Sequence, residues 1–187
     1  MLVTICDAQW YDPDKVNKKA GDIYAQANEA ATAGNNVLSI KYLTDAIKTE
    51  PRFADAFLTR ASLYASFKKY DSAAIDFETA LQLDSVYSKS YLLSYSISLA
   101  GIGKFQQALD AVNKFLTIEK LNAQSIKSAN YRKASYEFAV DYAKKHPSNG
   151  YVFAPQNLGD SINTAALEYF PSLTIDGKKT SIYQKAS

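Results

Sequence analysis

The stretch IYAQANEA at residues 23–30 returns 34 residues later as FLTRASLY at residues 57–64, and this recurrence decides the fold. The stretch SIKYLTDA at residues 39–46 returns at the same offset as AAIDFETA at residues 73–80. A third copy begins with YLLSYSIS at residues 91–98 and continues, after one extra residue in the turn at 101–104, with Ala108, Val112 and Phe115. A period of this length with two apolar segments per copy is typical of a repeated pair of helices.

Apolar and small residues within each copy fall at helical intervals. Ile23, Ala27 and Ala30 lie on one face of the first segment, and the second segment has the same kind of spacing. The small side chains of Ala27 and Ala61 allow the two helices of a pair to approach closely. Tyr95 takes this place in the third copy, so we expect the third pair to be splayed or rotated.

The turns divide the chain into seven expected helices. Asp12-Pro13 is a helix start, and Gly34-Asn35-Asn36 separates the first two helices. A single pair cannot bury its own apolar face, so the pairs must stack. The fold class is therefore all-α, with three helix pairs and a final capping helix whose outer face is polar. The predicted helices are 13–33, 36–49, 53–66, 70–83, 87–101, 105–119 and 122–145.

Composition argues against several classes of function. The chain has 187 residues, a net charge of +2 with interspersed acids and bases, and one cysteine. These features predict no nucleic-acid partner and no intrachain disulfide. No apolar run approaches the ~18 residues of a membrane span. His146 is the only histidine, and no nucleophile with a base, phosphate loop or metal-ligand cluster is evident, so we expect no catalysis, cofactor or metal.

The order of large, small and aromatic residues over this period resembles the tetratricopeptide-repeat family. The resemblance implies a right-handed superhelix over residues 9–146 that binds a protein or peptide in its groove. By the geometry of the family, the first helix of each pair lines this groove. The matching positions are Tyr24, Asn28, Ala31, Asp55, Leu58, Ser62, Ala65, Lys89, Leu92, Ser96 and Leu99.

The expected groove is apolar rather than basic. The best-known subset of the family grips the C-terminal carboxylate of chaperones with lysines, an arginine and asparagines. Asn28 matches that subset, but Tyr24 replaces a lysine, and Leu58 and Leu92 remove charge that a carboxylate needs. The groove suits an extended or helical peptide with apolar anchors. Alternatively, the same residues pack against the seventh helix or the C-terminal tail.

The two ends of the chain differ from the repeats. Residues 1–8, MLVTICDA, resemble the tail of a secretory signal peptide, with a frayed strand as the alternative. In the segment 147–187, Asp176-Gly177 within EYFPSLTIDGKK (168–179) predicts a β-hairpin. This motif resembles the opening of a β-propeller blade. We expect residues 147–187 to be an incomplete blade or tail that lies across the array or flexes, and the chain to be a gene fragment.

A helical array followed at once by this motif resembles envelope proteins of Bacteroidetes that end in an OmpA-like domain. One branch, the PorE-like proteins, belongs to the type IX secretion and gliding apparatus. The resemblance implies a periplasmic or outer-membrane-associated scaffold that binds another envelope protein. The alternative hypothesis is a structural spacer for a lost propeller, with no ligand of its own.

Overall fold

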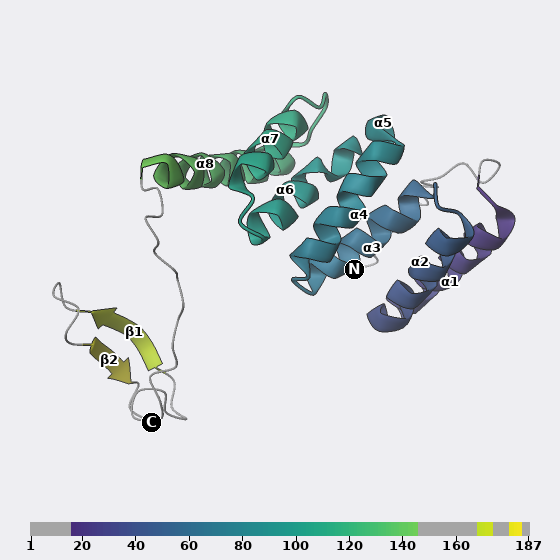
Figure 1. The fold of residues 1–187 in the computed structure, drawn as a ribbon, viewed down its shortest axis with the longest axis horizontal. Helices are drawn as coiled ribbons and strands as arrows, with labels where there is room; N and C mark the ends of the chain where they lie inside the picture. The colour runs from purple at the N-terminus through teal and green to yellow at the C-terminus, as the bar shows by residue number, and fades with distance from the viewer. Residues whose placement is uncertain (1–15, 146–167, 174–179, 185–187) are drawn as a thin grey trace. The chain divides into compact units, whose positions relative to one another are not determined.

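The computed structural model describes residues 16–145, 168–173 and 180–184. The chain divides into two compact units, residues 1–147 and residues 148–187. The described part of the first unit is helical, and that of the second is a pair of strands (Figure 1). The predicted signal-peptide remnant at residues 1–8 and the predicted helix start at Asp12-Pro13 lie outside the described residues.

Helix pairs build the described part of the first unit. α1 packs on α2, α3 on α4 and α6 on α7, and successive pairs meet through α2–α3 and α4–α6 contacts. Figure 1 shows the pairs following one another, with α8 after α7. The all-α architecture of three helix pairs and a final helix is confirmed. The bounds are α1 (Lys18–Thr32), α2 (Asn36–Thr49), α3 (Ala54–Ser66), α4 (Tyr70–Leu83), α6 (Leu92–Gly101), α7 (Phe105–Leu116) and α8 (Ala123–Lys145).

The residues at the turns determine where the helices begin and end. α1 begins at Lys18, and the Asn17 side chain caps it by accepting a hydrogen bond from the N–H of Lys19 at 3.0 Å. Gly34 adopts a φ of +79° after α1, a conformation that glycine reaches without strain. Asn35 then caps α2 by accepting from the N–H of Leu38 at 3.1 Å.

The small residues of the repeat lie where helices meet. Ala27 and Ala61 are fully buried within their pairs, and Ala46 and Ala80 are fully buried on the second helices. One apolar cluster contains residues of α1 and α2, a second contains residues of α3 and α4, and a third joins α6, α7 and α8. Each pair therefore contributes its own section of a continuous core.

The third pair departs from the first two at its start. The predicted helix 87–101 begins earlier and is divided into α5 (Ser85–Ser88), the 3-10 turn η2 (Lys89–Tyr91) and α6. Asp84 caps α5 by accepting from two backbone N–H groups. The Ser88 hydroxyl donates to the carbonyl oxygen of Ala80 at 3.0 Å. This bond ties the segment to the last turn of α4, and the helix tightens before α6 begins.

Arg60 of α3 joins three helices. Its Nε and Nη2 each donate to one oxygen of Asp76 on α4 at 2.8 Å, and its Nη1 donates to Thr44 Oγ1 on α2 at 3.0 Å. The guanidinium also lies over the rings of Phe57 and Tyr64. Two parallel bonds to a buried carboxylate constrain how α3 and α4 pack.

The exposed surface of α8 is less polar than the sequence predicts. Ala129 and Tyr136 are buried in the cluster shared with α7, whereas Tyr131, Phe138 and Tyr142 are 75%, 69% and 55% exposed. These three residues follow one another at helical spacing, so they form one aromatic stripe. The prediction of a polar outer face is confirmed in part, because exposed residues such as Lys127 and Glu137 share this surface with the aromatic stripe.

The second unit contains the predicted hairpin. β1 (Glu168–Leu173) and β2 (Thr180–Gln184) pair in antiparallel orientation. The register shifts between Tyr169 and Ser172, where Pro171 has no N–H to donate to a ladder. The strand pairing is confirmed, whereas the turn at 174–179 lies outside the described residues.

Candidate functional site

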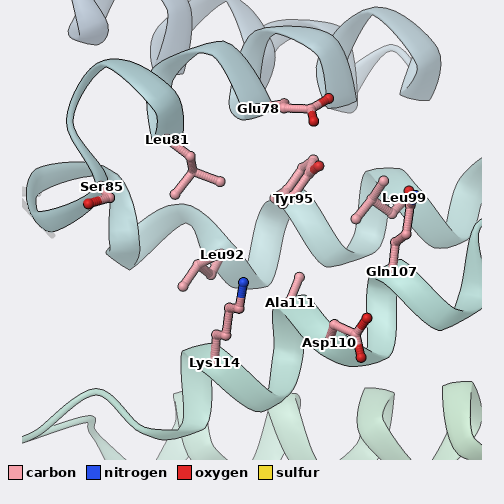
Figure 2. A pocket seen from close by; sticks show the side chains of 10 residues that line it. All are labelled: Glu78, Leu81, Ser85, Leu92, Tyr95, Leu99, Gln107, Asp110, Ala111 and Lys114. Carbon is pink, nitrogen blue, oxygen red and sulfur yellow. The ribbon is translucent and has the colours of Figure 1, made fainter.

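A hollow of about 480 Å³ opens between α4, α6 and α7. Leu81 of α4, Leu92 and Leu99 of α6, and Ala111 of α7 provide its apolar surface (Figure 2). This volume falls in the range of ligand pockets, roughly 300–1,000 Å³. The other lining residues are Glu78, Ser85, Tyr95, Gln107, Asp110 and Lys114.

The hollow lies where the repeat departs from its own pattern. Tyr95 occupies the place of Ala27 and Ala61, which are fully buried. A tyrosine ring is too large to be enclosed there, so Tyr95 stays partly exposed and lines the hollow, with its ring edge-on at 6.5 Å from that of Phe77. Burial, and then the nearby Glu78 carboxylate, raise the pKa of Tyr95. We attribute the hollow to this large residue at a position that is small in the other two pairs.

A second hollow of about 600 Å³ adjoins the first at the start of α6. The two share Leu92 and Lys114. Residues of η2 and of the segment after α7 also line the second hollow. Its lining therefore contains more lysines than that of the first hollow. Its lining residues are Lys89, Leu92, Lys114, Thr117, Ile118, Glu119 and Lys120.

The residues predicted to line a groove fall into three groups. Those at the third pair, Lys89, Leu92 and Leu99, line the hollows. Asn28 and Ser62 are exposed on α1 and α3, and Ala31 and Ala65 are partly exposed. The others, Tyr24, Asp55, Leu58 and Ser96, are buried.

Leu58 is a predicted groove residue that neighbouring side chains enclose. Its side chain is 1% exposed and belongs to the core cluster of Phe57 and Phe77. It lines neither of the two hollows, although it lies on a helix that was expected to line the groove.

Tyr24 and Asp55 belong to a polar cluster that joins α1, α3 and α5. Tyr24 Oη and Thr59 Oγ1 share a hydrogen bond of 2.9 Å, and the Tyr87 hydroxyl donates to Asp55 Oδ1. Burial raises the pKa of the Asp55 carboxyl and that of the Tyr87 hydroxyl. Because these polar groups bond to one another, we assign the cluster a role in holding the first helices of successive pairs together.

The contributions of α4 and α7 to the hollow were missed by sequence reasoning, which assigned binding to the first helix of each pair. Gln107, Asp110 and Lys114 recur at intervals of three and four residues along α7, next to buried Ala111. Such a polar row beside a small buried residue, opposite the anomalous Tyr95, is the signal that could have found the hollow.

The hollow offers a ligand apolar surface bordered by carboxylates, an amide and an ammonium group. Among residues 16–145, 168–173 and 180–184, no group of three or more His, Cys, Asp or Glu residues could hold a metal ion. Within the same part of the chain, no helix is both long enough and apolar enough to span a membrane.

Comparison with known proteins finds curated relatives that are similar to part of the chain. No protein-family model matches the chain. The small glutamine-rich tetratricopeptide repeat-containing protein 2 of Saccharomyces cerevisiae is 33% identical over 123 residues, which cover 66% of this chain and 35% of that protein. The chain thus spans about a third of the length of this curated relative.

Solved structures show the fold. The first TPR of Spaghetti (RPAP3), bound to the HSP90 peptide SRMEEVD, matches with a TM-score of 0.59 and 20% identity, covering 67% of this chain and 97% of that one. The Sgt2 TPR domain from Aspergillus fumigatus matches with a TM-score of 0.54 and 14% identity, covering 78% and 95%. The described helices therefore form a tetratricopeptide-repeat solenoid.

The comparisons overturn the location expected from the sequence. The similar proteins are small glutamine-rich tetratricopeptide, Sgt2 and RPAP3 repeat proteins rather than bacterial envelope proteins. The prediction of a periplasmic or outer-membrane-associated protein is wrong. The resemblance to OmpA-like and PorE-like proteins of Bacteroidetes, and to a β-propeller, is likewise not supported by these matches.

Proposed function

We propose that this chain is a non-catalytic interaction scaffold that binds a peptide segment of a partner protein in the hollow between α4, α6 and α7. The observation that carries the proposal is the concave apolar surface formed by the partly exposed side chains of Leu81 and Leu92, with buried Leu99 and Ala111 also in the lining. Peptides commonly bind by inserting apolar side chains into such surfaces. Burial of one leucine-sized side chain contributes about 1.5–3 kcal/mol, so contacts along the adjoining hollow would be needed as well.

The solved structures support a peptide as the class of ligand. The RPAP3 domain binds an HSP90 peptide. At 20% identity this similarity supports the shared fold alone. The ligand of this chain must therefore be inferred from its own residues. On the first two pairs, Tyr24 is engaged with Thr59, Leu58 is enclosed, and Asp55 is a buried carboxyl that disfavours an acidic ligand. We therefore place the proposed anchor at the third pair.

The remaining predicted residues have different roles in this proposal. Asn28 and Ser62 are exposed and would contact a ligand that extends along α1 and α3. The buried members of the predicted groove would hold the helices in position. The scaffold carries out no reaction in this proposal, because the sequence brings no nucleophile together with a base.

A selection from a phage-displayed library of random dodecapeptides, performed on the immobilised full chain, tests the proposal. Leu92→Glu places a carboxylate in the hollow, and Gln107→Trp fills it from an exposed rim position. Both substitutions should abolish binding of the enriched peptides. Ile75→Glu is the matched control, because Ile75 is exposed on α4 outside the hollow.

Circular dichroism of each variant separates loss of binding from loss of fold. Peptide binding that survives Gln107→Trp in a folded protein would contradict the site. A wild-type chain that enriches no peptide would contradict the function and favour the alternative hypothesis of a spacer without a ligand.

A further inference from the structure

The two hollows adjoin along α6 and α7, and we treat them together as one binding surface, which we call the α6–α7 groove. Leu92 and Lys114 belong to both hollows and mark where they meet. The α6 side runs from Lys89 to Leu99, and at ~1.5 Å per helical residue this distance is about 15 Å. A groove of this length holds about four or five residues of extended peptide, at ~3.3 Å each.

Charges along the α6–α7 groove are separated by sign. Glu78 and Asp110 line only the first hollow, whereas Lys89 and Lys120 line only the second. Figure 2 places Glu78 next to Tyr95 and Lys114 next to Leu92, at the junction. The second hollow also contains one acid, Glu119, so three lysines outnumber it there.

These charged groups are available to a ligand. Glu78, Asp110, Lys89, Lys114 and Lys120 are all exposed. The ion pairs found among the described residues involve other side chains. Asp110 accepts a hydrogen bond of 3.1 Å from the neutral Gln106 amide and is in none of these ion pairs.

We infer that the α6–α7 groove selects a peptide of defined charge polarity. Its ligand carries apolar side chains at the centre, a basic residue beside Glu78 and Asp110, and an acidic residue beside Lys89 and Lys120. This inference rests on the proposed function and names its ligand class. Exposed ion pairs add little affinity singly, but a peptide in the reverse orientation meets like charges at both ends, and that repulsion provides specificity.

The same library selection tests the inference when the enriched peptides are sequenced. Only peptides that fail to bind Gln107→Trp are counted, which restricts the result to this groove. On the wild-type chain these peptides should carry basic and acidic residues on opposite sides of an apolar centre. Lys89→Glu with Lys120→Glu should weaken the tightest wild-type peptide by about tenfold at low ionic strength, measured by fluorescence anisotropy.

The matched control is Lys18→Glu with Lys41→Glu, which changes the net charge equally at exposed positions of α1 and α2. We expect this control to change affinity by less than about twofold, since it lies outside the groove. Groove-dependent peptides without charge order, or an equal loss in the control, would overturn the inference and leave the proposed function standing. The absence of any groove-dependent peptide would overturn both.

Discussion

Gly101 at the end of α6 lies directly against the ring of Tyr70 at the start of α4. A Cβ atom on Gly101 would lie 2.9 Å from Cε2 of Tyr70, and nearer still to Cγ and Cδ2. α4 and α6 reach this approach because residue 101 has no side chain. The contact borders the same α4–α6 junction that contributes to the hollow.

Gly101→Ala should therefore lower the free energy of unfolding by about 1–3 kcal/mol, because the added methyl group overpacks the contact. The gain in helix propensity, up to about 1 kcal/mol, offsets only part of this cost. Urea denaturation measures the change. In a Tyr70→Ala background the same substitution should be neutral or stabilising, and an equal loss in both backgrounds would assign the cost to another cause.

Lys68 holds a left-handed backbone conformation in the turn between α3 and α4. Its φ is +57°, and the corresponding turns of the other pairs have Gly34 at +79° and Gly103 at +77°. This conformation costs a residue with a Cβ about 1–2 kcal/mol, whereas the extra freedom of glycine in the unfolded chain costs about 0.5–1 kcal/mol. Lys68→Gly should therefore stabilise the fold by about 0.5–1 kcal/mol, seen as a rise in Tm.

The neighbouring residue provides the control for this prediction. Lys69 has an ordinary negative φ of −81°, so Lys69→Gly should not raise the Tm. A Tm that falls in Lys68→Gly would mean that the lysine side chain contributes more to stability than its backbone conformation costs.

Asp55 should make stability depend on pH. Burial raises its pKa above the ordinary value of 3.8, although the Tyr87 hydroxyl donates to it. A carboxyl whose pKa is higher in the folded state binds its proton more tightly there. The stabilisation that this tighter proton binding gives to the folded state is complete below the unfolded-state pKa. It is lost as the pH rises through the folded-state pKa.

Asp55→Asn keeps an oxygen that accepts from Tyr87 and removes the titration. We expect this variant to be more stable than wild type near pH 7, with the difference shrinking toward about pH 3. Chemical denaturation at a series of pH values measures it. Asp71→Asn, at an exposed position of α4, is the control. A difference that stays constant with pH would show that desolvation of the Asp55 charge is not its cause.

The helix pairs could be predicted because local residue types determine them. Ala27 and Ala61 are buried at the positions that the 34-residue period assigns, and Gly34 ends a helix as its conformational freedom predicts. The hollow could not be located in the same way, because it depends on how α4, α6 and α7 meet. Periodicity placed Leu58 on the correct helix but could not show that neighbouring side chains enclose it.

The C-terminal motif shows a different limit of prediction from sequence, because it specifies local structure but not a protein family. Residues 168–173 and 180–184 form the expected antiparallel pair, with a register shift beside Pro171. An Asp-Gly turn is common in hairpins, and proline in strands generally lies at edges or irregularities of the ladder. Such chemistry specifies local backbone structure, and many unrelated proteins use it. For this reason the motif predicted the strands correctly, whereas the envelope family that it suggested is not supported by the matches.

The aromatic stripe of α8 contributes little to the stability of the fold in the structure. Because Tyr131 and Phe138 are largely exposed, their joint replacement by serine should change the free energy of unfolding by less than about 0.5 kcal/mol. Buried Tyr136 is the contrasting position, where substitution by alanine should cost about 3 kcal/mol. Since exposed aromatic surface promotes association, light scattering of the double variant should show less aggregation than wild type. If the double variant instead loses more than about 1 kcal/mol, these rings are covered in solution and the stripe is part of an internal interface.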